Sequence, residues 1–173
     1  MGFEIKLTDN SDKILSELTK TKQAALEAVG HQVESYAKAN VKASGLIDTG
    51  RLINSITHVS KTHAGVSRRY KTDKKGVVLA DREVQITTDE EDKVTVGSAV
   101  SYAPYHEYGT GIYSDSGAGR KTAWRYMTFN RQTGKYEAVW TRGTKPKHFL
   151  RNAIVNHQEQ IKRIIEQYLR GNI

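Results

Sequence analysis

Apolar residues in the N-terminal part of the chain recur at steps of three and four, which is the spacing of one face of an α-helix. The recurring positions are Ile14, Leu18, Ala25, Val29, Val33, Tyr36, Ala37 and Val41. Asn10, Ser11 and Asp12 stand directly before most of this pattern and are residue types that cap helix N-termini. The pattern predicts a long amphipathic helix over about residues 11–42, in which Gly30 is a locally weak point.

A second helical pattern occupies about residues 146–170. Its apolar positions are Phe149, Leu150, Ala153, Ile154, Ile161, Ile164, Ile165, Tyr168 and Leu169. Pro146 suits the first turn, where a backbone N–H has no partner within the helix, and Gly171 is a typical stop. We expect Phe149 and Leu150 to anchor this helix in the core, because large apolar side chains are mostly buried.

Between the helices, apolar and polar residues alternate in short runs, the period of a strand with one buried face. The runs expected to pair are residues 82–88 with 93–98, and residues 123–129 with 135–141. The first hairpin would turn at the acidic residues 89–92 and the second at residues 130–134. A separate strand is expected at residues 56–60. The sequence therefore predicts two antiparallel hairpins between the helices.

Two stretches lack the apolar side chains that a core needs. Residues 61–80 are polar and basic, and predict a long hairpin arm or a flexible loop. The central cations of this arm are Arg68, Arg69, Lys71, Lys74 and Lys75. Residues 109–120 are rich in glycine and serine and predict a flexible loop. We expect both stretches to become ordered only in an assembly, because each has little to bury alone.

The order of elements predicts one α+β domain over residues 1–173. Two long helices would pack on one face of a mainly antiparallel sheet, with long loops or hairpin arms. A chain of 173 residues is long enough to bury a sizeable core. No apolar run approaches the roughly 20 residues of a membrane span, so no membrane association is expected.

The net charge of +8 is unevenly distributed. Residues 57–80 hold 6 basic and 1 acidic side chains, whereas residues 81–99 hold 2 basic and 6 acidic side chains. A basic protein can contact nucleic acid or an acidic protein partner, and charge alone does not choose between them.

Few residue patterns in the chain suggest catalysis or metal binding. The chain has no cysteine, which excludes thiolate nucleophiles, disulfides and cysteine-bound zinc. Its histidines form no HxH or HxxxH pair, and the acidic residues 89–92 lack the spacing and glycine of a calcium loop. A G-x-S-x-G elbow and a phosphate-binding loop are also missing. We therefore expect a protein without catalytic residues, metal or cofactor.

Three segments carry a resemblance to a known family. They read DTGRLINSI at residues 48–56, VGSAVSYAPYHEYGTG at residues 96–111, and TRGTKPKHFLRNA at residues 141–153. Taken in this order, they resemble the tail-completion, or head–tail joining, family of long-tailed bacteriophages (siphophages). The resemblance implies a small α+β subunit of the virion neck, made in the host cytoplasm, and no catalysis.

The resemblance also implies partners. Copies of the chain would form a ring, expected to be a hexamer, around the channel that DNA crosses. The ring would contact a head-closure or adaptor protein on one side and the tail-tube or tail-terminator protein on the other. The arm at residues 61–80 is then a candidate contact with channel DNA or with a partner.

The three segments supply candidate contact residues. Asp48 or Thr49 could cap a helical turn that ends near residue 56, with Arg51 solvated; alternatively Arg51 reaches a carboxylate of a neighbouring subunit. The other candidates are Tyr102, Tyr105, Glu107, Tyr108, Arg142, Lys145, Lys147 and Arg151. The three tyrosines are spaced by three, which places them on one side of a helical turn, either in the core or at a subunit interface. The cations could be a solvated surface, or face an acidic partner or DNA.

Two alternative functions stay open at this point. The chain could be a minor head or tail subunit elsewhere in the particle, and the sequence does not separate this from the neck. It could also be a basic nucleic-acid-binding module, which the charge of +8, the arm and the nearby tyrosines would suit.

Overall fold

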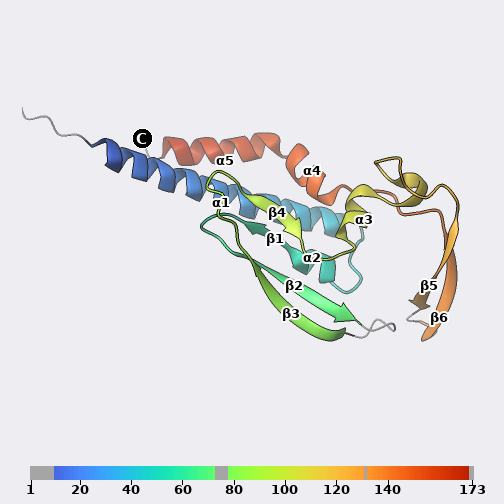
Figure 1. Cartoon of the computed structure of the whole chain (residues 1–173). Helices are drawn as coiled ribbons and strands as arrows, with labels where there is room; N and C mark the ends of the chain where they lie inside the picture. The colour runs from blue at the N-terminus through green and yellow to red at the C-terminus, as the bar shows by residue number, and fades with distance from the viewer. Residues whose placement is uncertain (1–9, 73–77, 131, 172–173) are drawn as a thin grey trace, which may run out of the picture.

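The computed structural model describes residues 10–72, 78–130 and 132–171, and shows helices and small antiparallel sheets (Figure 1). The helices are α1 (Ser11–Ala43), α2 (Arg51–Ser55), α3 (Ala103–Tyr108), the 3-10 helix η1 (Gly111–Tyr113), α4 (Phe149–Val155) and α5 (Gln158–Arg170). The strands are β1 (Ile56–Val59), β2 (Gly65–Thr72), β3 (Val78–Ile86), β4 (Thr95–Ser98), β5 (Trp124–Asn130) and β6 (Lys135–Thr141). The predicted α+β class is confirmed.

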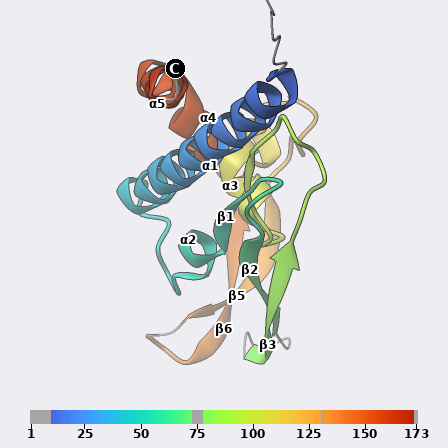
Figure 2. The same cartoon turned by 90° about the vertical axis from the view of Figure 1, so that its left-hand side faces the viewer.

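Helix α1 is the element on which most of the others pack. It begins and ends within one residue of the predicted range of 11–42. Helices α4 and α5 contact it, and so do β1 and β4. Figure 2 shows α5 and the strand pairs β1–β4 and β2–β3 on different sides of α1. The long amphipathic helix therefore organises the domain, as its apolar pattern predicts.

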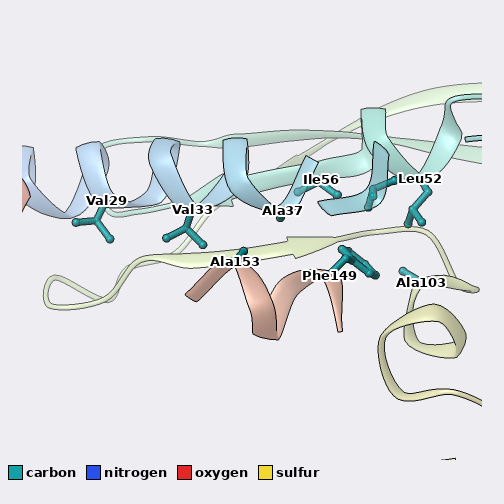
Figure 3. Close-up of a cluster of buried hydrophobic side chains, with 9 residues drawn as sticks. Val29, Val33, Ala37, Leu52, Ile56, Ala103, Phe149 and Ala153 are labelled. Carbon is teal, nitrogen blue, oxygen red and sulfur yellow. The ribbon is translucent and has the colours of Figure 1, made fainter. Parts of the chain in front are cut away.

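The hydrophobic core joins α1 to all three segments quoted above. Its buried members are Val29, Val33, Ala37, Val41, Leu52, Ile56, Ala103, Phe149 and Ala153. Figure 3 shows the α1 side chains pointing toward Phe149 and Ala153 of α4. Phe149 has no exposed surface, which confirms its predicted role as an anchor, and Leu150 packs partly buried against the same cluster.

The strands form three separate two-stranded antiparallel sheets, and the single sheet expected from the sequence is not present among the described residues. The predicted pairing of residues 123–129 with 135–141 is confirmed as β5–β6, in register from Trp124 opposite Thr141 to Asn130 opposite Lys135. The β1–β4 pair packs on α1, and β2 contacts α2 and β1.

The predicted hairpin of residues 82–88 with 93–98 is wrong. Strand β3 pairs with β2, and β4 pairs with β1, where Ile56 lies opposite Ser98. The acidic residues 89–92 therefore form a connection between two different strand pairs. An ion pair of Asp92 with Lys22 joins this connection to α1, and an ion pair of Glu91 with Lys61 joins it to the turn after β1. The sequence predicts a hairpin arm or a flexible loop at residues 61–80, and the structure shows the paired strands β2 and β3 of a hairpin. Residues 73–77, between these strands, lie outside the described residues.

Strand β1 is buried along its whole length because α1 covers it. Glu34 on α1 fixes the contact: its Oε2 accepts a hydrogen bond from the backbone N–H of His58 (3.0 Å) and lies 2.6 Å from His58 Nδ1. The partner strand β4 adds Val96 beside the core, and Val94 before the strand does the same. The β1–β4 pair is thus the inner sheet, and β2–β3 extends away from it (Figure 1).

The C-terminal helix differs from its prediction in two ways. It begins at Phe149, so Pro146 precedes it instead of lying in its first turn. It is also interrupted at Asn156 and His157, where Nδ1 of His157 lies 3.2 Å from the carbonyl oxygen of Ala153. That carbonyl would otherwise accept the backbone N–H of His157, which donates to Ile154 instead (3.1 Å). A side chain that enters the hydrogen-bond ladder in this way is a recognised cause of a kink.

In the part of the chain that the structure describes, we find no helix that is both long enough and apolar enough to cross a membrane.

Candidate interface site where the three segments meet

The second and third segments quoted above run side by side, joined by backbone hydrogen bonds. The N–H of Lys147 donates to the carbonyl of His106 (2.7 Å), and that of His148 donates to the carbonyl of Glu107 (3.3 Å). These bonds fasten the end of α3 to the residues before α4. They also explain why helix α4 starts late, since the backbone of residues 147 and 148 is engaged with α3.

The contact continues along the two glycine-containing turns. The N–H of Thr110 donates to the carbonyl of Thr144 (2.9 Å), and the N–H of Ile112 donates to the carbonyl of Arg142 (3.0 Å). In return, the N–H of Thr144 donates to Oγ1 of Thr110 (2.9 Å). The sequences YGTG and RGT therefore form one interlocked unit, although about 30 residues of the β5–β6 hairpin and its flanks separate them.

Glycine is required at two points of this unit. Gly111 has a φ of 60° and Gly143 a φ of 124°, which are backbone conformations that L side chains rarely adopt. A Cβ on Gly111 would lie 2.0 Å from the carbonyl oxygen of Arg142, and a Cβ on Gly143 would lie 2.0 Å from that of Thr110. The two turns are thus closer together than any side chain allows.

Glu107 is buried between α3 and α4, with 4% of its surface exposed. Its Oε2 accepts a hydrogen bond from the N–H of Leu150, and its Oε1 accepts one from the N–H of Arg151, both at 2.9 Å. The carboxylate thereby satisfies two N–H groups in the first turn of α4, which have no partner within the helix. The sequence suggests Glu107 as a residue that contacts a partner, whereas the structure places its carboxylate inside the subunit.

Glu107→Gln is expected to lower the free energy of unfolding by about 2 kcal/mol, because one charge-assisted hydrogen bond is lost and the amide offers only one acceptor. Urea denaturation followed by circular dichroism measures the loss. Glu159→Gln is the matched control, since this carboxylate is exposed on α5 and its loss should change little. Equal stability of the two variants would contradict the capping role.

The first segment meets the second at a hollow of about 450 Å³. Its walls are residues 45–52 together with Tyr102 and His106. The sequence suggests Asp48 or Thr49 as the cap of the helical turn that ends near residue 56. Helix α2 instead begins at Arg51, with Gly50 at its N-cap position. Gly50 has a φ of 74°, a conformation that glycine adopts without strain, and the helix has no side-chain cap hydrogen bond.

His106 is half-buried on α3 and lines the same hollow. Burial lowers the pKa of its imidazole, and the positive charge of Lys147 lowers that pKa further. Both effects favour the neutral form of the ring. Its Nδ1 atom is buried without a hydrogen-bond partner among the described residues. Sequence reasoning did not single out this residue, because its neighbours give no sign of the burial.

The three tyrosines do not share one environment. Tyr102 packs partly buried against the core, whereas 58% of Tyr105 and 52% of Tyr108 is exposed. Tyr102 thus packs against the core, whereas Tyr105 and Tyr108 are exposed on the surface of the subunit. Their role at a subunit interface stays a prediction. Exposed tyrosines are well suited to interfaces, because an apolar ring and a polar hydroxyl serve a surface that is partly wet.

The cations of the third segment lie beside this surface. Arg142, Lys145, Lys147 and Arg151 are all exposed. Lys145 Nζ lies 5.8 Å from the centre of the Tyr113 ring, and Arg151 Nη1 lies 3.6 Å from Asp115 Oδ2. The loop of residues 109–120 is thereby joined to α4, and its flexibility in solution stays a prediction.

Only part of the basic arm at residues 61–80 lies within the described residues. Arg68, Arg69 and Lys71 lie on strand β2, whereas Lys74 and Lys75 lie outside the described residues. Among the described residues, no group of three or more histidine, aspartate and glutamate side chains could hold a metal ion.

The geometry is that of a packed structural site with an exposed rim of tyrosines and cations. The family model described as "Bacteriophage HK97-gp10, putative tail-component" matches residues 5–109, which is more than half of the 173 residues. The chain therefore belongs to this family, whose description as a tail component supports a structural role in the bacteriophage virion and points to a non-enzymatic protein. No curated protein and no solved structure matches the chain.

The matched range ends at Gly109, in the middle of the interlocked unit. It includes the first segment and most of the second. The hairpin β5–β6 and helices α4 and α5 lie outside it, although Phe149 and Ala153 of α4 belong to the core.

Proposed function

We propose that this protein joins the phage head to the tail tube, as a ring of identical subunits around the DNA channel in the neck. The observation that carries the proposal is the meeting of three separate segments at one place on the surface. These segments resemble the tail-completion family, and the tail-component match supports a structural role in the same part of the particle. The proposal includes a hexameric ring and no catalytic activity.

The exposed part of the site has the make-up of a protein-binding surface. Tyr105 and Tyr108 are exposed on α3, and the N–H of the exposed Arg151 is hydrogen-bonded to Glu107 of the same helix. Tyrosine and arginine are among the residues enriched at the energetic centres of interfaces. Behind them, the interlocked turns and the buried Glu107 carboxylate hold the backbone in place. A rigid surface of this kind loses little conformational entropy when it binds.

The partners follow from the place in the particle and from charge. A head-closure or adaptor protein would contact one side of the ring, and the tail-tube or tail-terminator protein the other. A cluster of exposed cations at residues 142–151 fits an acidic patch on one of these partners, which would guide their association. Cations of the arm would face the DNA channel without binding the DNA tightly.

Deleting the protein from its phage is expected to give filled heads and separate tails, because each can assemble without the joint. Electron microscopy of negatively stained lysates counts joined particles, heads and tails. Expression of the protein from a plasmid should restore joined particles, and is the control. Joined particles at the normal frequency without the protein would contradict the proposal.

The net charge of +8 favours a second candidate, a nucleic-acid-binding module. Tight binding of duplex DNA by the purified protein at physiological salt, together with normal joining in the deleted phage, would support that function. Location of the chain in a density map of the virion would separate a neck subunit from a minor subunit elsewhere in the head or tail.

A further inference from the structure

The β5–β6 hairpin stands apart from the body of the domain. Its two strands pair with each other, and no other described strand pairs with either of them. Figure 1 shows the hairpin at the opposite end of the molecule from the N-terminal end of α1. A two-stranded hairpin is marginally stable in water unless a hydrophobic face is covered. An exposed apolar face of this hairpin is therefore a candidate for a contact with another chain.

The register of the hairpin sorts its side chains onto two faces. Directly paired residues lie on the same face of a sheet, and alternate pairs bring together Arg125 with Trp140, Met127 with Ala138, and Phe129 with Tyr136. These six residues are called the hairpin face. The T-shaped contact of Phe129 with Tyr136, at 5.3 Å between ring centres, agrees with this assignment. The other face carries Thr128, Glu137 and Lys135 toward the turn of the hairpin. Toward its base the same face carries Trp124, Tyr126 and Val139, of which Tyr126 is 46% and Val139 37% exposed.

The hairpin face is apolar and exposed. Trp140 is 69% exposed, Met127 56% and Phe129 44%. Tyr136, on the same face, is 39% exposed. Large side chains at these four exposures present on the order of 400 Å² of apolar surface, since a buried aromatic side chain covers about 150–250 Å². A stable interface buries about 800 Å² on each partner, so this face amounts to roughly half of one. Tryptophan, tyrosine and arginine are the residues that dominate binding energy.

A second apolar surface lies at the N-terminal end of α1. Ile14 is 63% exposed, Leu15 60% and Leu18 54%; these three residues are called the α1 tip. Ile14 and Leu18 continue the stripe that becomes buried from Ala25 onward. The first turns of α1 extend past the C-terminal end of α5 (Figure 1), so α5 does not cover this part of the stripe.

The charges around the α1 tip suit the hairpin face. By helical spacing, Asp12 and Glu17 flank the tip, while Lys13 and Lys20 project from the opposite side of the helix. Arg125 is the charged member of the hairpin face and could pair with either carboxylate at the rim of a contact. Each of the two surfaces therefore has an apolar centre, and the positive charge of Arg125 on one is complementary to the carboxylates that flank the other.

We infer that the hairpin face of one copy packs on the α1 tip of a second copy. The two surfaces are different and lie at opposite ends of the molecule, so the contact is head-to-tail. When each copy binds the next in the same way, the copies form a ring if the rotation between neighbours closes. This inference rests on the proposed function and names the surfaces that would build its ring. The hairpin lies outside the matched residues 5–109, whereas the α1 tip lies within them.

The absence of cysteine in the chain makes cross-linking a direct test. One variant carries Met127→Cys and another Leu15→Cys, and the two purified full-length proteins are mixed and oxidised. We expect a disulfide-linked dimer in the mixture, and little in either variant alone. Lys135→Cys mixed with Leu15→Cys is the control, because residue 135 lies on the other face of the hairpin.

Two results would overturn the inference. Cross-linking of Met127→Cys with itself would show that two hairpin faces pack together in a two-fold dimer. A mixture that gives no more dimer than the Lys135→Cys control would show that the hairpin face does not meet the α1 tip. Neither result concerns the joining of heads to tails, which the deleted phage tests separately.

Trp140→Ser supplies an independent measurement of the same contact. Analytical ultracentrifugation is expected to show self-association weakened about 30-fold or more, the loss typical of a residue at the energetic centre of an interface. Because Trp140 is 69% exposed, the circular dichroism melt should stay unchanged. Lys135→Ser is the control on the opposite face. Unchanged self-association of the Trp140→Ser protein would contradict the inference.

Discussion

Gly143→Ala is expected to lower the free energy of unfolding by about 3–5 kcal/mol, since the added Cβ combines backbone strain with overpacking. The new atom would lie 2.0 Å from the carbonyl oxygen of Thr110 and 2.9 Å from Cα of Gly111. Both obstacles are backbone atoms, so no side-chain rotation can relieve the clash. The interlocked turns would have to separate, which also breaks the hydrogen bond from Thr110 to Thr144.

Gly117→Ala is the matched control for this variant. Gly117 also has a positive φ, of 67°, but a Cβ there would meet nothing within 4 Å. Its substitution should cost only the left-handed conformation, about 1 kcal/mol. Urea denaturation of both variants, followed by tryptophan fluorescence, separates strain from the close approach. A cost for Gly143→Ala no larger than that for Gly117→Ala would show that the two turns are not in contact in solution.

Phe149→Ala is expected to destabilise the protein by a similar amount, about 3–5 kcal/mol, the range for removing a buried aromatic side chain. Phe149 has no exposed surface and packs between α1 and the segments that carry Leu52 and Ala103. Its removal would leave a cavity where all three segments meet, because the backbone on each side is fixed by hydrogen bonds. The site surface should loosen along with the core.

The same helix supplies the control for this prediction. Ile154 is 50% exposed on α4. Ile154→Ala should lower the free energy of unfolding by about 1 kcal/mol or less, because about half of this side chain is already in contact with water. The urea midpoints of the two variants give the comparison, provided that the slopes of the transitions agree. Equal midpoints would mean that α4 does not bury Phe149 in solution.

Elements that depend on local pattern could be predicted from the sequence. The apolar stripe of α1 gives its bounds within a residue, because one face of the helix is buried from Ala25 to Val41. The β5–β6 hairpin could be predicted because its two alternating runs follow each other closely, and no other described strand competes for either of them.

Partner choice between strands could not be predicted from alternation. Val94 and Val96 pack against the core, whereas Ile86 is 36% exposed, yet all three stand in similar alternating runs. Alternation identifies the two faces of a strand and says nothing of its neighbour. The burial of β1 under α1 decides the pairing, because β4 supplies the apolar side chains that complete the inner sheet.

The candidate site was visible in the sequence only as separate strings. Glu107 stands between His106 and Tyr108, where a charged side chain usually points to solvent. The N–H groups that it satisfies lie 43 and 44 residues later in the chain. No local signal connects them. The kink at His157 escaped prediction for a related reason, since histidine breaks the helix there only by reaching the carbonyl of Ala153.

The position of Phe149 in the chain has a consequence for biosynthesis. A ribosome completes α1, β1 and β4 well before it reaches this residue, and Asn40 Nδ2 donates to the carbonyl of Phe149 across 109 residues of sequence (3.0 Å). Until then, the apolar stripe of α1 lacks the part of its packing that Phe149 and Ala153 of α4 supply. The nascent chain must therefore keep that stripe soluble, which favours a chaperone-bound or loosely collapsed intermediate and folding after most of the chain has been made.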